Sequence, residues 1–189
     1  MLNIEKRGCM RTIETERLLL RPWELTDKED LYEYAQSDLV GPSAGWKPHV
    51  DMNESVEIIK MFMNDEEVYA IELKEEKKVI GGFGIHKRYP DPELKDLNQR
   101  EIGYVLNPKY WGNGYVPEAS KEAIDYCFNV LKTDIVWCCH YDFNAKSKRV
   151  IEKSGFKYHF TKEEVLERLD NKKVTTLYYK MTKEDYFKE

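Results

Sequence analysis

The segment that most constrains the fold starts at Glu101, where a strand, a glycine-bearing loop and a helix start follow one another. Residues 101–106 read EIGYVL, and such β-branched and aromatic side chains are typical of a strand. Gly112 and Gly114 lie in the next loop, and Pro117 stands where a first helical turn tolerates proline. The free N–H groups and the dipole of a helix start attract anions, and glycine lets a ligand approach the backbone. This order of elements predicts a site for an anionic phosphate.

Two better-known phosphate motifs are absent from this loop. No lysine followed by serine or threonine comes after Gly114, which excludes the P-loop of nucleoside-triphosphate-binding proteins. No third glycine completes the dinucleotide-binding fingerprint. Because two glycines alone are a weak signal, an ordinary strand-to-helix turn stays open as the alternative at this point.

The composition excludes several classes of protein. The chain has 189 residues, of which 41% are hydrophobic, and this is enough for one domain with a sizeable core. Its net charge of −5 argues against a nucleic acid as partner. No apolar segment approaches the roughly 20 residues that span a membrane, and the first ten residues are too polar for a signal peptide. We therefore expect a cytoplasmic protein with neither a nucleic-acid nor a membrane partner.

The cysteines and histidines do not suggest a metal site. The four cysteines and four histidines are scattered, without the spacing that metal ligands need. Cys138 and Cys139 stand in an apolar segment, so we expect buried, reduced thiols. The sequence thus predicts no metal cofactor.

The periodicity of the chain predicts an α+β fold, with one mixed, mostly antiparallel sheet flanked by helices. The predicted strands span residues 16–21, 67–73, 79–86, 101–106, 135–140, 156–160 and 174–181. The predicted helices span residues 30–37, 116–131 and 144–154, and one more follows a cap at Asp51. Strand 101–106, helix 116–131 and strand 135–140 make a βαβ unit. We expect residues 13–189 to form one domain after a loose extension over residues 1–12, in which Met10 is an alternative start.

Three local patterns refine this outline. Residues 26–29 (TDKE) read as a capping box before the first helix. Residues 39–50 are rich in glycine and proline, which predicts a loop that exposes Trp46 and His49. Residues 162–169 favour a helical turn between the last two strands.

Four segments together carry a family resemblance. They are TERLLLR (residues 15–21), EIGYVL (101–106), YWGNGY (110–115) and NAKSKRVIEKSGF (144–156). In order and spacing they resemble the GNAT superfamily of N-acetyltransferases, in its branch of enzymes similar to ribosomal-protein-alanine acetyltransferases. Each segment is weak alone, but together they cover residues 13–182 and are specific. The resemblance favours a phosphate site over an ordinary turn, and it implies the GNAT-like acyl-CoA N-acyltransferase fold.

The resemblance implies acetyl-CoA as the acetyl donor and as the ligand of the glycine loop. In the family the pantetheine arm runs beside the central strand, which here provides Tyr104, Val105 and Leu106. The pyrophosphate lies on loop N–H groups, here those of Gly112, Asn113, Gly114, Tyr115 and Val116. Asn144 matches the family's asparagine that contacts the pantetheine.

The resemblance also implies catalytic roles. Acetyl transfer needs a base that takes a proton from the ammonium, and Glu101 matches a position that often holds this base, directly or through water. A solvated carboxylate at a strand end is the alternative for Glu101. The backbone N–H of Val105 is expected to stabilise the developing oxyanion. Ile151 stands where many members have a tyrosine that acts as the general acid. Ser147 matches a serine that hydrogen-bonds the CoA sulfur.

The acceptor stays open between a protein N-terminus and a small primary amine. Trp46 and His49 lie in the loop that usually walls the acceptor pocket, and His140 is a further substrate contact or an alternative base. No cysteine stands in a nucleophile motif, so we expect direct transfer in a ternary complex. The missing tyrosine at Ile151 leaves a non-catalytic acyl-CoA-binding protein as the alternative function, and a homodimer stays open as the oligomeric state.

Overall fold

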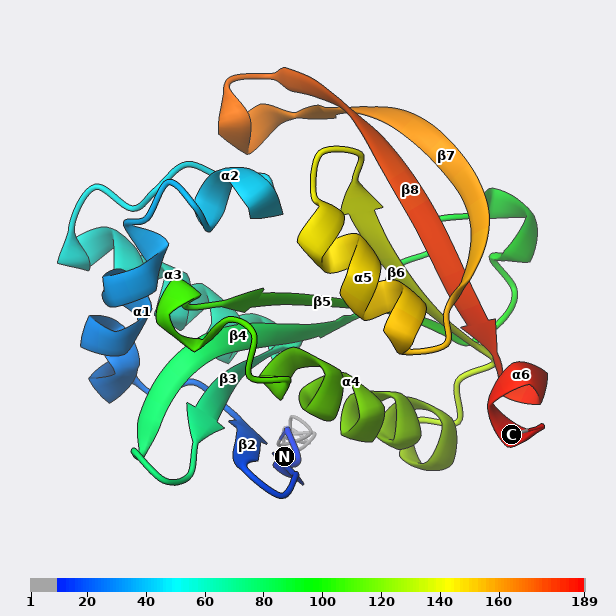
Figure 1. Cartoon of the computed structure of the whole chain (residues 1–189), viewed down its shortest axis with the longest axis horizontal. Coiled ribbons are helices and arrows are strands. Elements are labelled where there is room, and N and C mark those ends of the chain that lie inside the picture. The colour runs from blue at the N-terminus through cyan, green and yellow to red at the C-terminus, as the bar shows by residue number, and fades with distance from the viewer. Residues whose placement is uncertain (1–9, 189) are drawn as a thin grey trace, which may run out of the picture.

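The structure is a computed structural model, and it describes residues 10–188. The predicted extension over residues 1–12 lies mostly outside these residues. Figure 1 shows a twisted sheet with helices packed on it. The strands are β1 (Ile13–Glu14), β2 (Leu18–Arg21), β3 (Val68–Leu73), β4 (Lys78–His86), β5 (Gln99–Leu106), β6 (Ile135–Tyr141), β7 (Lys157–Leu166) and β8 (Lys172–Thr182). The helices are α1 (Lys28–Ala35), α2 (Gly41–Ala44), α3 (Met52–Asp65), α4 (Tyr115–Asp125), α5 (Ala145–Lys153) and α6 (Lys183–Phe187).

The eight strands form one sheet in the order β1-β2-β3-β4-β5-β6-β8-β7. Within residues 10–188 only β5 and β6 pair in parallel, and the other neighbours pair antiparallel. Helix α4 connects the two parallel strands, because a parallel pair needs a crossover. The predicted mixed, mostly antiparallel sheet and its βαβ unit are therefore confirmed.

Each face of the sheet covers a separate hydrophobic core. Alternate side chains of β5 go to opposite faces, so Ile102 and Leu106 join the core under α4, whereas Val105 packs with Trp23 and Ile59 on the other face. Figure 1 shows α4 and α5 on the near side of the sheet. The predicted strand over residues 101–106 is confirmed, and its alternation separates the groups that β5 presents to its two faces.

The start of α1 differs from the predicted capping box at residues 26–29. The hydroxyl of Thr26 donates to the carboxylate of Glu24 (3.3 Å) instead of capping the helix. Asp27 stabilises the helix start instead, because its carboxylate accepts a hydrogen bond from the N–H of Glu24 (2.9 Å) and pairs with Arg21 (2.8 Å). Arg21, six residues before Asp27, thus helps to hold this carboxylate at the helix start.

The predicted helical turn at residues 162–169 is wrong over most of its length. Residues 162–166 continue β7 and pair with β8, and only Glu167–Leu169 form one 3₁₀ turn. The strand pairing overrides the local helical pattern, since every added pair satisfies backbone groups along both strands. Asp170 and Asn171 then make the turn to β8, with positive φ values of 53° and 56°.

The predicted loop over residues 39–50 contains the short helix α2 and folds inward. His49 is buried, with 8% of its surface exposed, and its Nδ1 lies 2.8 Å from the hydroxyl of Ser55. The expectation that this loop exposes His49 is therefore wrong. Trp46 is half-buried, and its ring lies 5.3 Å from the His49 ring. The segment forms a wall of the cavity described below.

Candidate active site

Strands β5 and β6 diverge in the middle of the sheet, which creates an opening. Their last paired residues are Ile102 and Cys138, although β5 continues to Leu106 and β6 to Tyr141. Beyond that pair, β5 has no strand on its β6 side within the described part of the chain. Its backbone groups there are available to a ligand that lies along the strand.

The strand register decides which backbone groups of β5 face this opening. The N–H of Asn107 donates to the carbonyl of Ile80 in β4 (2.8 Å), and Val105 stands opposite Gly82 two residues earlier. Hydrogen-bonded pairs alternate along an antiparallel ladder, so Val105 also directs its N–H to β4. The predicted oxyanion donor, the N–H of Val105, is therefore wrong, and the peptide group of Tyr104 faces the opening in its place.

Leu106 is the other residue of β5 whose peptide group faces the opening. Its carbonyl already accepts a hydrogen bond from the indole N–H of Trp111 (2.9 Å). This bond ties the glycine loop to the end of β5. The backbone groups left for a ligand are therefore those of Tyr104 and the N–H of Leu106.

The glycine loop has the backbone geometry that the sequence predicts. Gly112 and Gly114 have positive φ values of 85° and 78°, a conformation that favours glycine, and Gly114 is the N-cap of α4. The helix begins at Tyr115, so the N–H groups of Tyr115 and Val116 have no acceptor within the helix. A Cβ added to Gly112 would meet nothing within 4 Å, which leaves the approach to the loop open.

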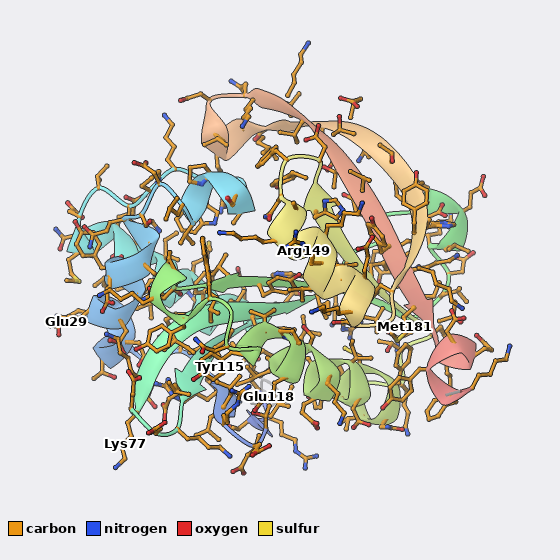
Figure 2. All side chains as sticks on the ribbon, in the orientation of Figure 1. Glu29, Lys77, Tyr115, Glu118, Arg149 and Met181 are labelled. Carbon is orange, nitrogen blue, oxygen red and sulfur yellow. The ribbon has the colours of Figure 1, made fainter. Side chains whose placement is uncertain are left out.

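An arginine clamp, which the sequence did not reveal, holds this loop. Arg17 pairs with Glu118 in the first turn of α4 (2.6 Å), donates to the carbonyl of Asn113 (3.1 Å) and lies 4.5 Å from the Tyr115 ring centre. Figure 2 shows Tyr115 and Glu118 together at the start of α4. Burial alone would raise the pKa of Glu118, but hydrogen bonds from Thr15 and Arg17 hold it below its usual value. The pairing neutralises a carboxylate close to the predicted phosphate site.

Helix α5 brings Asn144 and Ser147 to the other edge of the opening. The side-chain oxygen of Asn144 accepts from the N–H of Ser147 (3.1 Å), and its amide donates to the carbonyl of Ser43 (3.2 Å). The Ser147 hydroxyl lies 3.1 Å from the hydroxyl of Tyr104. Burial raises the pKa of Tyr104, so this hydroxyl stays protonated at neutral pH. The contact between Tyr104 and Ser147 joins β5 to α5 across the opening.

A cavity of about 630 Å³ brings most of the predicted site residues together. The predicted residues in its lining are Trp46, His49, Glu101, Tyr104, Val105, His140, Asn144 and Ser147. The glycine loop is not part of this lining. The site therefore has two parts, a loop suited to phosphate and a cavity suited to the reacting groups.

Glu101 lies in the cavity wall, with 6% of its surface exposed. Its Oε1 accepts a hydrogen bond from Nη1 of Arg88 (2.8 Å). Its other carboxylate oxygen has no hydrogen-bond partner among residues 10–188. The alternative of a solvated strand end does not fit this buried, paired carboxylate, and one of its oxygens is free to receive a proton.

His140 has no free ring nitrogen with which to act as a base. Its Nδ1 lies 2.8 Å from the carbonyl of Tyr141, and its Nε2 lies 3.2 Å from the hydroxyl of Tyr179. A carbonyl only accepts hydrogen bonds, so Nδ1 carries the proton and Nε2 accepts from Tyr179. The geometry argues against His140 as the alternative base.

The described residues contain neither a metal-binding cluster nor a membrane-spanning helix. Within residues 10–188 no three histidine, cysteine or acidic side chains gather in a way that could hold a metal ion. Over the same range, no helix is both long and apolar enough to cross a bilayer.

Comparisons with known proteins concern the family and the fold of the chain. The model of the acetyltransferase (GNAT) domain family matches residues 17–157. The uncharacterized N-acetyltransferase p20 of Bacillus licheniformis is 34% identical over 129 residues, which cover 65% of this chain and 68% of that protein. A solved GNAT-family acetyltransferase from Bacillus anthracis has a TM-score of 0.80 and 25% identity, over 92% of this chain and 99% of that one. The microcin C7 self-immunity acetyltransferase MccE, solved with acetyl-CoA and AMP, has a similar fold (TM-score 0.71, 19% identity, 88% of this chain and 93% of that chain).

Proposed function

Because the chain belongs to the GNAT acetyltransferase family, we propose that it transfers the acetyl group of acetyl-CoA directly to a primary amine in a ternary complex. The observation that carries this proposal is the opening between β5 and β6, which has Glu101 in the wall of its cavity and Ser147 at its α5 edge. The acetyltransferase activity is the family's, whereas the donor, the acceptor class and the order of the reaction are our proposals.

The donor acetyl-CoA supplies an activated acetyl thioester when it is bound. The N–H groups of the loop over residues 112–116 and the dipole of α4 bind its pyrophosphate, since glycine leaves them accessible. The carbonyl of Tyr104 and the N–H of Leu106 hold the pantetheine arm, in the place of a missing strand. The complex of MccE with acetyl-CoA supports this choice of donor.

Three groups of the chain accept the proton or stabilise the charges that arise during the transfer. Glu101 takes the proton of the acceptor ammonium, directly or through water, at the oxygen that Arg88 does not occupy. The N–H of Tyr104 is the donor to the acetyl oxygen as negative charge develops there. The Ser147 hydroxyl donates to the sulfur of the leaving thiolate. Each group stands on a strand or helix, which fixes its direction.

The cavity cysteines support direct transfer over an acetylated enzyme. Cys138 and Cys139 both line the cavity, but burial raises the pKa of each thiol. A protonated thiol is a poor nucleophile, because the thiolate is the reactive form. We therefore expect initial-rate kinetics with intersecting lines, and parallel lines would contradict direct transfer.

The Tyr104–Ser147 pair gives a prediction about turnover. The Tyr104 and Ser147 hydroxyls lie 3.1 Å apart and either can donate, so Tyr104 can act as the donor and leave the serine its own proton for the sulfur. We expect Ser147→Ala and Tyr104→Phe each to lower kcat by roughly tenfold, about the effect of one lost hydrogen bond. Acetyl-CoA affinity should fall less. Because the two hydroxyls act on the same proton, kcat of the double variant should be little lower than kcat of either single variant.

The matched control for this cycle is Tyr110→Phe. It removes a tyrosine hydroxyl whose hydrogen bond goes to the exposed Glu76, away from the cavity lining. We expect wild-type kcat for this variant. Equal losses of kcat and affinity in Ser147→Ala would mean a ground-state contact only, and fully additive losses in the double variant would contradict the pairing.

The test of the proposed function is a thiol-release assay. The protein is incubated with acetyl-CoA and a panel of amines, amino acids, polyamines, aminoglycosides and peptides, and free CoA is measured. Acceptor-dependent release supports transfer. Binding of acetyl-CoA without release for any acceptor would favour the alternative, a non-catalytic acyl-CoA-binding protein, which the apolar Ile151 motivates.

A further inference from the structure

The acceptor side of the cavity is bridged by contacts between distant parts of the chain. Lys47 pairs with Asp170 at the β7–β8 turn (2.6 Å), and the amide of Asn144 donates to the carbonyl of Ser43 in α2 (3.2 Å). A Cβ added to Gly45 would lie 2.6 Å from the Tyr141 hydroxyl, so the backbone there approaches the end of the Tyr141 side chain closely. Figure 1 shows α2 and the β7–β8 turn at the same end of the molecule. These contacts roof the cavity and favour a small acceptor over the N-terminus of a folded protein.

The charged side chains of the cavity leave one cation without a partner. The lining contains three basic side chains, Lys47, Arg88 and Arg168, and two acidic ones, Glu54 and Glu101. Lys47 pairs with Asp170 and Arg88 pairs with Glu101. Arg168 has neither a hydrogen bond nor an ion pair in the part of the chain that the structure describes.

The remaining polar groups of the cavity that bear on this charge do not pair with Arg168. Burial lowers the pKa of His49, which keeps its imidazole neutral at pH 7. The Glu54 carboxylate accepts from the N–H of Val50 (2.8 Å) at the start of α3. The acceptor side of the cavity thus presents an unpaired guanidinium at Arg168.

We propose that the acceptor is a small amine that also carries an anionic group, a carboxylate or a phosphate, which Arg168 binds. This rests on the proposed function, since it names the acceptor of the same transfer. A guanidinium binds either anion through two parallel N–H groups, so the shared chemistry is an oxyanion a short distance from the amine. Polyamines and aminoglycosides bring further positive charge into the same cavity, and they are disfavoured for the same reason.

The test compares acceptors that differ only in the anionic group. The pairs are an α-amino acid against its amide, and an aminoalkyl phosphate against the matching amino alcohol, each assayed by release of free CoA. For the wild-type protein we expect kcat/KM to be on the order of tenfold higher for the anionic member, about the effect of one charge-assisted hydrogen bond at a partly exposed site. The two pairs also separate a carboxylate from a phosphate preference.

Arg168→Gln should remove this preference through KM, while the rate on the neutral members stays near wild type. Lys173→Gln is the matched control, because it removes a positive charge from the same hairpin but does not line the cavity. Its anionic-to-neutral ratio should equal that of the wild type.

Three results would overturn the inference. If the ratio of kcat/KM between anionic and neutral acceptors were unchanged in Arg168→Gln, the guanidinium would not bind the anionic group. Equal or faster turnover of amides, polyamines or aminoglycosides would contradict the anionic acceptor, and a preference for long peptides would contradict the roofed cavity. In these cases acetyl transfer itself still stands. Failure of every acceptor to release CoA would instead contradict the proposed function, and the inference with it.

Discussion

Gly114→Asp is expected to abolish acetyl-CoA binding while the protein stays folded. Gly114 caps α4 with a φ of 78°, and aspartate is one of the few other residues that tolerate this conformation. The new carboxylate would stand where the proposed site binds pyrophosphate. Two unit charges about 4 Å apart near a surface repel by about 4 kcal/mol, which corresponds to a loss of roughly a thousandfold in affinity. Titration calorimetry with acetyl-CoA measures this directly.

The matched control for Gly114→Asp is Gly114→Asn, which adds nearly the same bulk at the same φ without the charge. We expect the asparagine variant to retain measurable affinity, and the difference between the two variants gives the electrostatic part. A Cβ at this position would lie 3.7 Å from the guanidinium of Arg17, so space is not the limit. Unchanged affinity in a folded aspartate variant would show that the pyrophosphate binds elsewhere.

Local sequence patterns predicted the position of the glycine loop and of the helix start after it. The positive φ of Gly112 and Gly114 follows from residues that are close in sequence, as does the start of α4 directly after them. The cap at Asp51, which accepts from the N–H of Glu54 (2.9 Å), is confirmed in the same way. In each case the residues that determine the geometry lie within a few positions of one another, where propensity and capping rules apply.

Features that depend on distant partners could not be predicted. The clamp between Arg17 and Glu118 joins residues 101 positions apart, and the only signal for it was the TERLLLR segment of the family resemblance. The direction of the Val105 N–H depends on the register of β4, and the partners of His140 depend on where Tyr179 in β8 lies. Side-chain identity alone does not contain these pairings. They decide which predicted site residue can act and in which direction.

The catalytic assignment with the largest expected effect on rate is Glu101. Glu101→Gln keeps the shape of the side chain and an oxygen for the hydrogen bond from Arg88, but it removes the basic carboxylate. General-base catalysis typically contributes about 10²–10⁴-fold, so kcat at neutral pH should fall within that range. The affinity for acetyl-CoA should stay near wild type, because Glu101 lies apart from the glycine loop. The loss should shrink as the pH rises, since more of the acceptor amine is then already neutral.

The ion pair with Arg88 makes a second explanation for such a loss testable. If Glu101 acted only by holding Arg88, removal of either partner would lower kcat equally. If Glu101 is the base, Arg88→Gln leaves the base in place, and the loss should be much smaller than in Glu101→Gln at the same pH. Comparing pH–rate profiles of the two variants separates these cases. Near-wild-type turnover of Glu101→Gln at neutral pH would refute Glu101 as the base. Since both ring nitrogens of His140 are occupied, an ordered water chain would then be the remaining proton acceptor.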